Sequence, residues 1–217
     1  MAIVNGYCTL AQVKASLRIP ASDTVDDALI ELAVEAASRE IDTITERQFF
    51  STVATRIYSP RDSTTTETDD IAVLTSIKTS SNADNVFDVT WAETDYQLSP
   101  LNGLAGGVVT PWNMIKAVGD YRFPTNNGYY NFSFDGGGYD SSAHIGEATV
   151  QVTGTFGFAT IPTAVVQACV ILSSRIFKRN DSPTGVMGFG DLGIIRVGFR
   201  DPDIDQLLAP YRRMRFA

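Results

Sequence analysis

One glycine-rich segment has the spacing of a nucleotide-binding loop. Gly188, Gly190 and Gly193 reproduce the pattern G-x-G-x-x-G. In a dinucleotide site such glycines lie between a strand and a helix, so that the pyrophosphate meets the amino end of the helix. Here an apolar helical pattern precedes the glycines and the β-branched run 194–197 follows them, and no kinase catalytic-loop signature accompanies them. The pattern favours a loop that a partner orders over a nucleotide site.

His144 is the single histidine and the obvious candidate for a general base. A serine triad needs this base beside a nucleophile and an orienting carboxylate, which a sequence alone does not bring together. His144 lies in a polar stretch, so a solvated loop position is the preferred interpretation. Cys8 and Cys169 are far apart in apolar patterns, which predicts buried free thiols and offers no metal-ligand spacing.

Acidic residues are a further candidate source of chemistry. Asp69, Asp70, Asp135 and Asp140 could in principle supply carboxylates for glycoside hydrolysis or for calcium binding. No loop has the ligand rhythm of a calcium site, and acidic loop tips are usually solvated. We therefore predict no catalytic residue, no metal site and no cofactor, and expect a protein that is not an enzyme.

Aromatic residues in the middle of the chain leave one alternative open. Trp91, Trp112, Tyr129 and Tyr130 could form a surface that binds sugar or a partner protein, although aromatic side chains in strands more often belong to a core. The alternative to a structural role is therefore a β-rich module that recognises carbohydrate or a host protein through residues 51–158.

The charge distribution argues against tight DNA binding. The 217 residues carry a net charge of −8, whereas proteins that grip DNA phosphates are led by Lys and Arg. Residues 1–174 contain 9 basic and 20 acidic side chains, but residues 175–217 contain 8 basic and 5 acidic ones. The carboxyl end could thus meet an acidic partner. The sequence shows neither a membrane-spanning run nor a signal peptide, which predicts synthesis in the cytoplasm.

Two helices are expected before residue 50. Thr9 and Gln12 form a capping box that opens a short helix ending near Leu17. The segment 24–49 then repeats apolar residues at a spacing of three and four, which predicts a long helix of about seven turns. Asp23 or Thr24 is the expected cap. The apolar stripe is wide and includes Leu29, so we expect it to pack within its own subunit and also against a neighbour.

The central region, residues 51–158, has the composition of a β domain. It is rich in Thr, Ser, Asn, Asp, Gly and aromatic residues, with short alternating runs. Turn-rich pieces between these runs, such as 102–107, are expected to be exposed loops. The expected strands are 53–58, 71–78, 86–91, 96–98, 115–121 and 148–156.

Helix returns after this insertion. The segment 161–179 is strongly apolar, with Pro162 suited to its first turn, and we pair it with the long amino-terminal helix as a core. A glycine-rich passage and a strand at 194–199 follow. Asp201 and Pro202 then open a last short helix ending near Ala209. The sequence predicts an α+β fold, with a helical core at 1–50 and 159–217, an antiparallel β insertion at 51–158 and an extended carboxyl-terminal segment.

This order of features resembles the head-to-tail adaptors of tailed bacteriophages, also called head-completion or connector proteins. The resemblance covers about 7–50 and 159–213, and its most specific part is the glycine-rich segment followed by Asp-Pro-Asp-Ile-Asp-Gln-Leu-Leu-Ala-Pro-Tyr-Arg-Arg at 201–213. The β insertion departs from the smallest members of the family.

The resemblance implies a homo-oligomeric ring, usually of twelve subunits, between the portal protein and a tail or stopper protein. It would be assembled in the host cytoplasm and reside in the virion neck, without membrane contact, while genomic DNA passes through its lumen without specific binding. An acidic lumen would let the DNA slide. The candidate portal or subunit contacts are Arg179, Phe189, Ile194, Ile195, Arg196, Val197, Phe199, Arg200, Tyr211, Arg212 and Arg213.

Overall fold

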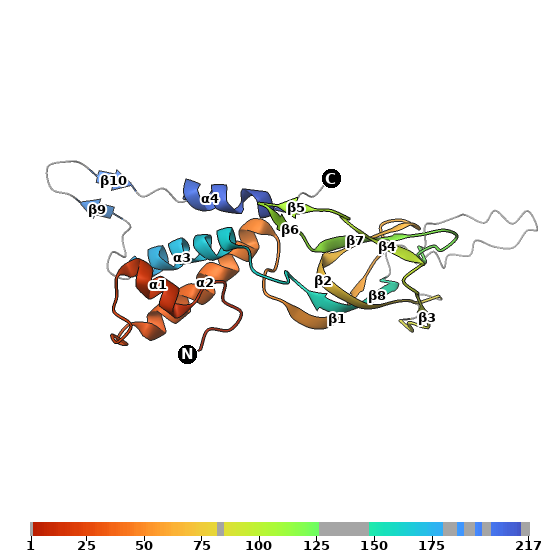
Figure 1. The fold of residues 1–217 in the computed structure, drawn as a ribbon, viewed down its shortest axis with the longest axis horizontal. Coiled ribbons are helices and arrows are strands. Elements are labelled where there is room, and N and C mark those ends of the chain that lie inside the picture. The colour runs from red at the N-terminus through yellow and green to blue at the C-terminus, as the bar shows by residue number, and fades with distance from the viewer. Residues whose placement is uncertain are drawn as a thin grey trace, which may run out of the picture. The chain divides into compact units, whose positions relative to one another are not determined.

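The computed structural model describes residues 2–81, 85–125, 148–179, 186–188, 194–196 and 201–213. It combines helices with an antiparallel sheet (Figure 1), which confirms the predicted α+β class. The chain forms two compact units. A helical unit comprises residues 1–50, 105–108 and 160–217, and a β unit comprises residues 51–104 and 109–159.

The first helix, α1 (Leu10–Leu17), begins as its sequence predicts. The Thr9 hydroxyl accepts a hydrogen bond from the Gln12 amide at 3.2 Å, and the Gln12 side chain accepts one from the Thr9 amide at 2.8 Å. This reciprocal pair satisfies two amide groups that the helix leaves free. Val13 is completely buried and attaches α1 to the helical core.

The long helix, α2 (Asp27–Thr45), is shorter than predicted, with 19 residues or about five turns. It begins after Asp26, whose side chain makes no capping bond, and the Asp23 carboxylate accepts from the Val25 amide just before the helix. Glu46 has a φ of 54°, in the left-handed region, and this residue ends the helix before Phe49. The predicted range 24–49 and the predicted cap at Asp23 or Thr24 are therefore wrong.

Only part of the predicted apolar stripe of α2 faces the core. Ile30, Ala33, Val34, Ala37 and Ile41 are buried. The remaining apolar residues of the predicted stripe are less buried: Leu29 is 47% exposed, Ala36 is exposed and Ile44 is half-buried.

The apolar helix α3 (Thr163–Lys178) lies beside α2 in Figure 1. Pro162 is its capping residue rather than part of its first turn. Cys169 on α3 and Cys8 are both buried and free, as predicted, with their sulfur atoms 3.2 Å apart. This contact joins the amino-terminal segment to the middle of α3.

A hydrogen-bonded tyrosine fixes the end of α2. The Tyr7 hydroxyl donates to the Asp42 carboxylate and accepts from the Phe49 amide at 2.9 Å. The Tyr7 ring meets the Phe49 ring edge-on, with centroids 5.5 Å apart, and Phe49 meets Tyr211 in the same way at 5.9 Å. Burial raises the pKa of both the Tyr7 hydroxyl and the Asp42 carboxyl above their usual values.

The last helix, α4 (Pro202–Leu208), confirms the predicted start. The Asp201 carboxylate accepts from the Asp203 amide at 3.0 Å, and Pro202 occupies the first helical position. α4 packs against α3 through the buried side chains of Ile204 and Leu208. A single 3₁₀ turn, Ala209–Tyr211, follows it.

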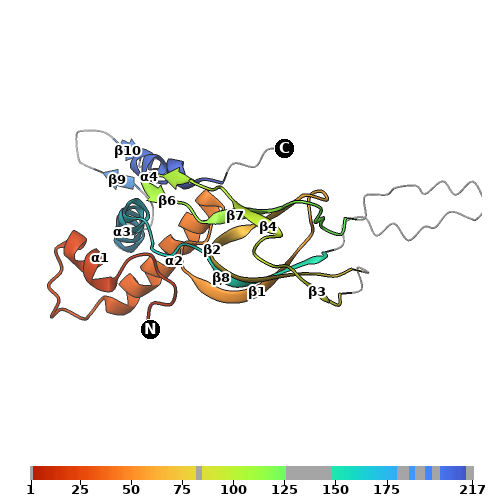
Figure 2. The ribbon, with the colours of Figure 1, turned by 45° about the vertical axis from the view of Figure 1, so that its right-hand side comes forward.

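The β unit is one antiparallel sheet, in which the strand order is β1-β8-β2-β7-β4 and β3 pairs with β2 (Figure 2). A two-stranded hairpin lies apart from this sheet. The sheet strands are β1 (Thr52–Tyr58), β2 (Thr65–Thr79), β3 (Val89–Thr90), β4 (Tyr96–Ser99), β7 (Trp112–Ala117) and β8 (Val150–Phe156), and the hairpin strands are β5 (Leu104–Ala105) and β6 (Val108–Val109).

The strand predictions hold best where residues alternate cleanly. β1 and β8 match closely, and Val150, Val152, Gly154 and Phe156 share a buried face as expected. β2 begins six residues earlier than predicted. The prediction missed its first half because the buried side chains there, Thr66, Thr68 and Asp70, are polar. β3 is shorter than the predicted 86–91, and β7 lies earlier than the predicted 115–121.

The hairpin of β5 and β6 was predicted to be a loop. Gly106 and Gly107 connect the strands with φ values of 56° and 78°, the backbone that a tight hairpin turn requires. A Cβ atom on Gly106 would lie 2.7 Å from the Tyr211 hydroxyl oxygen. Glycine is therefore needed at residue 106 both for its backbone angle and for space.

The core of the β unit contains the first tryptophan. Trp91 is 6% exposed, stacks on Phe123 with ring centroids 4.6 Å apart, and donates its indole N–H to the Thr79 hydroxyl at 3.0 Å. Trp112 is half-buried and packs against the same cluster. Tyr129 and Tyr130 lie outside the described residues. The core interpretation of Trp91 is thus confirmed.

Candidate functional site

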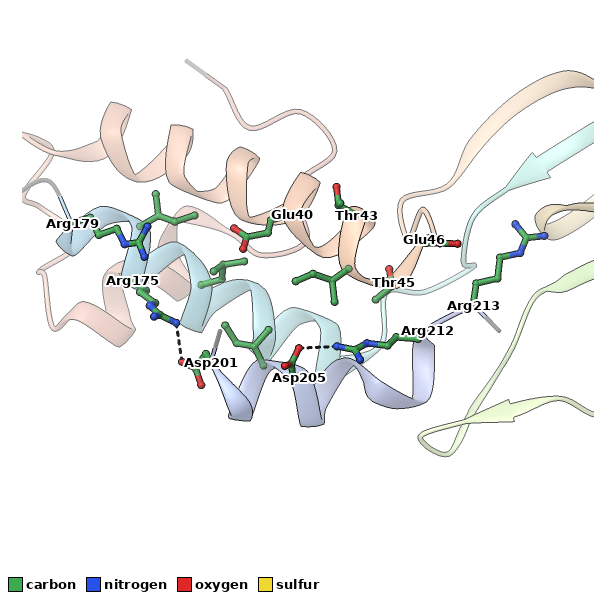
Figure 3. A pocket seen from close by; sticks show the side chains of 14 residues that line it. Glu40, Thr43, Thr45, Glu46, Arg175, Arg179, Asp201, Asp205, Arg212 and Arg213 are labelled. Atoms are coloured by element: carbon green, nitrogen blue, oxygen red, sulfur yellow. Dashed lines mark hydrogen bonds and ion pairs between the residues drawn. The ribbon is translucent and has the colours of Figure 1, made fainter. Parts of the chain in front are cut away.

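The helical unit contains a groove of about 560 Å³. Its walls are the carboxyl-terminal halves of α2 and α3, together with α4 and the residues that follow α4 (Figure 3). Three segments that are far apart in sequence, 40–46, 172–179 and 201–213, therefore contribute to one surface.

The groove has an apolar floor. Leu172 and Ile204 are 6% and 4% exposed, and Ile44 and Ile176 are half-buried. α2 contributes Ile44, α3 contributes Leu172 and Ile176, and α4 contributes Ile204. An apolar floor of this kind suits contact with apolar side chains of another protein.

Charged side chains surround this floor. Two ion pairs involve α4 and its cap: Arg175 Nη1 on α3 lies 3.6 Å from Asp201 Oδ2, and Arg212 Nη2, just after α4, lies 2.7 Å from Asp205 Oδ1 (Figure 3). Asp201 both caps α4 and binds α3, so a single carboxylate sets where α4 begins and what it rests on. The charged lining residues are Glu40, Glu46, Arg175, Arg179, Asp201, Asp205, Arg212 and Arg213.

The described lining of the groove consists of carboxylates, arginines, threonines and aliphatic side chains. Among the described residues that line it there is no histidine, cysteine or serine. The hydroxyls of Thr43 and Thr45 donate to the backbone oxygens of Arg39 and Ile41, at 3.0 and 2.8 Å, as helical threonines commonly do. The arrangement can bind apolar and charged groups of a protein surface.

The structure brings three of the predicted contact residues to this groove. Arg179, Arg212 and Arg213 all line it, and the Arg213 amide donates to the Thr45 oxygen at 2.9 Å. Tyr211 is 2% exposed, so its side chain is an internal contact of the helical unit.

The remaining predicted contact residues belong to the segment before α4. Ile194, Ile195 and Arg196 form β10 (Ile194–Arg196), which pairs antiparallel with β9 (Val186–Gly188). The predicted strand 194–199 is described only over 194–196. The other four predicted residues, Phe189, Val197, Phe199 and Arg200, lie outside the described residues.

Sequence reasoning missed the α2 side of the groove. None of Glu40, Thr43 and Glu46 was predicted to line a site. Arg175 and Asp201 carried one usable signal, since a basic residue at the end of a helix and an acidic cap at the start of the next helix are a plausible pair. That signal alone does not establish that the two side chains meet, which depends on how α4 packs against α3.

The nucleotide-like motif has no helix where a phosphate site needs one. Gly188 ends β9, and β10 begins at Ile194 directly after the motif. A hairpin thus replaces the strand-to-helix turn that dinucleotide sites use. Residues 189–193 lie outside the described residues.

The other candidate chemistry finds no support in the described part of the chain. The Asp69 carboxylate accepts from Arg56 at 2.7 Å and from Tyr58 at 2.9 Å, and Asp70 is buried. No group of three or more His, Cys, Asp or Glu residues there could hold a metal ion. His144, Asp135 and Asp140 lie outside the described residues. None of the described helices is long and apolar enough to cross a membrane.

Comparison with known proteins gives a likeness at the level of structure. No protein-family model matches the sequence, and no curated protein matches it. A chain from the neck of an empty gene transfer agent (GTA) particle, computed with C6 symmetry, superposes with a TM-score of 0.59 at 17% identity, covering 100% of this chain and 95% of that one. A chain from the neck of the native GTA particle, computed with C12 symmetry, gives 0.57 at 16% identity, covering 100% and 94%.

A chain from the virion of the native GTA particle gives a TM-score of 0.53 at 16% identity, covering 100% of this chain and 95% of that chain. The shared feature is the fold, over the full length of the chain. The resemblance to head-to-tail adaptors is confirmed at this level.

Proposed function

We propose that this chain is a structural protein of the neck of a phage-like particle, in which identical copies form a ring. The observation that carries the proposal is the likeness over the whole chain, both units included, to chains from GTA necks. Those necks were computed with sixfold and twelvefold symmetry. A closed ring of identical copies requires that each copy present two different, complementary surfaces.

We further propose that the ring is a dodecamer that lies between the portal protein and a tail or stopper protein. The helical residues, 1–50 and 159–217, would form the adaptor core, and the β insertion, 51–158, would offer a docking surface to the tail side. Arg179, Arg212 and Arg213 would contact the portal or a neighbouring subunit from the rim of the groove. The hairpin of β9 and β10 would extend a partner's sheet by adding its edge.

The charge of the chain suits a DNA channel. Because residues before 175 carry 11 more acidic than basic side chains and residues 175–217 carry 3 more basic than acidic ones, a ring of many copies repels phosphates unless its basic ends face inward. We propose an acidic lumen through which the genome moves without specific binding. A basic lumen in the assembled ring would contradict this part of the proposal.

Deletion of the reading frame in the producing strain tests the role. Without an adaptor, heads fill with DNA but cannot attach tails, so electron microscopy of purified particles should show filled heads without tails. Imaging of wild-type particles should place the chain in the neck. Tailed, intact particles from the deletion strain, or a neck without this chain, would overturn the proposal.

Complementation separates the contact residues from general effects on folding. A plasmid-borne double variant, Arg212→Ala with Arg213→Ala, should restore fewer tailed particles than the wild-type gene. The matched control is Arg122→Ala, an exposed arginine of the β unit whose guanidinium donates only to backbone oxygens nearby. Equal complementation by the double variant and the control would remove Arg212 and Arg213 from the interface.

The alternative, a carbohydrate- or host-binding β module, gains nothing from the described residues. Its best sequence support was the set of aromatic residues, and Trp91 belongs to the core. Binding of purified chain to host polysaccharide, with tails still attached in the deletion strain, would favour this alternative.

A further inference from the structure

The only two cysteines of the chain meet in the core of the helical unit. Cys8 belongs to the segment 2–9, which precedes α1, and Cys169 lies in the middle of α3, 161 positions further along the sequence. Their sulfur atoms are 3.2 Å apart, and both side chains are buried. Because a disulfide joins sulfur atoms about 2.05 Å apart, each sulfur has to move by only about 0.6 Å to form one.

Two buried serines border the sulfur atoms, Ser38 on α2 and Ser173 on α3. Ser38 Oγ lies 3.5 Å from Cys169 Sγ, and Ser173 Oγ lies 3.8 Å from each sulfur. Both hydroxyls donate to backbone oxygens, Ser38 to that of Val34 at 2.7 Å and Ser173 to that of Cys169 at 2.6 Å. Since these protons are already engaged, the serine oxygens are left as acceptors for the thiol protons.

One thiol of the pair is more acidic than the other. The hydrogen bond from Cys8 lowers the pKa of the Cys169 thiol to about 7, against the opposing effect of burial. The same hydrogen bond raises the pKa of the Cys8 thiol. Since the thiolate is the form that reacts with oxidants, Cys169 is the sulfur that an oxidant attacks first.

The segment 2–9 gives a small oxidant a route to the pair. It contains neither helix nor strand, and Tyr7 and Cys8 are its only buried residues. Segments with few buried side chains open locally at a lower free energy than the helices of a core do. A brief opening of this segment uncovers the two sulfur atoms, so a molecule as small as hydrogen peroxide can reach them.

We propose that Cys8 and Cys169 form a disulfide when the particle leaves the reducing interior of the cell. The inference rests on the proposed function, because a neck protein is made among reduced thiols and then works outside the cell, where disulfides form and persist. The bond joins the segment 2–9 covalently to α3. The neighbouring Tyr7 is already hydrogen-bonded to Ser38 and Asp42 on α2, so the disulfide holds α2 and α3 together.

Hydrogen peroxide can supply the oxidation. The Cys169 thiolate attacks one peroxide oxygen and the O–O bond breaks, which gives a Cys169 sulfenic acid and a hydroxide that regains the proton lost by Cys169. The Cys8 sulfur then attacks Cys169 Sγ. The S–S bond forms, the S–O bond breaks, and the departing hydroxide takes the Cys8 proton. The two thiols together lose two electrons, and the peroxide is reduced to two water molecules.

Treatment of the purified full-length chain with hydrogen peroxide tests the site. We expect a monomer on a denaturing gel without reductant, and no thiol that reacts with maleimide in denaturant. Trypsin should release peptides 1–14 and 123–175 as one linked species, and dithiothreitol should separate them and return both thiols. Two thiols that survive the peroxide, dimers linked between chains, or oxygen added to the cysteines in place of the bond would each overturn the proposal.

The stability of the oxidised chain tests whether the bond holds the helices together. The disulfide closes a loop of about 160 residues, so the urea midpoint of the wild type, followed by circular dichroism, should rise on oxidation. Cys169→Ser, treated identically, is the matched control, since it keeps the four methionines that peroxide also oxidises. Its midpoint should show no rise. A linked wild-type chain with no higher midpoint than before oxidation would overturn the stabilising role of the bond.

Released particles separate this inference from the proposed function. Acid precipitation followed by alkylation in denaturant records the state of the thiols. The chain from cell lysates should carry alkylated Cys8 and Cys169, whereas the chain from released particles should yield the linked peptides. Reduced cysteines in released particles, or linked peptides already present in the lysate, would overturn the disulfide proposal alone. A neck that lacks the chain refutes the proposed function instead.

Discussion

The Lys14 ammonium group connects α1 to the start of α2, and its removal is expected to destabilise the helical unit. Lys14 is 5% exposed. Its Nζ lies 2.7 Å from Asp27 Oδ1 and 3.4 Å from the Ala21 oxygen, and it also donates to the Asp23 oxygen. These bonds fix the loop between α1 and α2. Lys14→Met keeps most of the aliphatic stem and deletes all three bonds.

The expected loss follows from these contacts. Hydrogen bonds to charged groups contribute about 1.5–3 kcal/mol each, and removing one partner of a buried ion pair costs about 3–5 kcal/mol. The Asp27 side chain is 26% exposed and can regain water, which places the cost below the sum of these contributions. We expect the free energy of unfolding of the helical unit to fall by about 2–4 kcal/mol.

Urea denaturation followed by far-ultraviolet circular dichroism measures this change, because most of the helical signal comes from this unit. Lys116→Met is the matched control, since Lys116 is exposed on β7. Its effect should stay within about 0.5 kcal/mol, the usual range for surface substitutions. A Lys14→Met loss as small as that of the control would refute the reasoning.

Three further predictions concern the buried groups. Burial raises the pKa of the Asp42 carboxyl, so the native state binds this proton more tightly than the unfolded chain does. The free energy of unfolding of the wild type should therefore rise relative to that of Asp42→Asn as the pH falls from the raised pKa to the ordinary one. A constant difference between the two proteins in urea titrations across that pH range would contradict this. Trp91→Phe should lower the free energy of unfolding by about 1–2 kcal/mol, because the buried Thr79 hydroxyl loses the indole N–H that donates to it. The fluorescence of the remaining tryptophan during denaturation measures this loss. An unchanged free energy would mean that water or another group replaces the indole. Cys8 and Cys169 should react with a maleimide only in denaturant, and labelling of either thiol in the native chain at the rate of a free thiol would argue against their burial.

The sequence by itself determined the features that depend on neighbours within a turn. The capping box of Thr9 and Gln12 and the Asp201-Pro202 start of α4 appear as predicted, because each requires only side chains and amides two or three residues apart. The alternation of side chains in β1 and β8 likewise allowed these strands to be predicted from the sequence. The α+β class followed from these local signals.

Other boundaries depended on contacts between distant residues. Periodicity predicted that α2 continues to Phe49, but the helix ends at Thr45, and Phe49 packs between Tyr7 and Tyr211. The sequence did not predict the first half of β2, because the residues buried there, Thr66 and Thr68, are polar. A polar run gives no sign that the tertiary structure will cover it.

Only the tertiary structure decided which apolar residues of α2 form the core and which stay exposed, because a helical repeat sets the spacing of a surface and not the direction that it faces. The groove has the same origin. Glu40, Arg175 and Asp201 are widely separated in sequence, and they meet because α4 returns along α3, where Ile204 and Leu208 are buried. Local signals extend over a few residues, whereas a surface built from three segments exists only once the chain has packed.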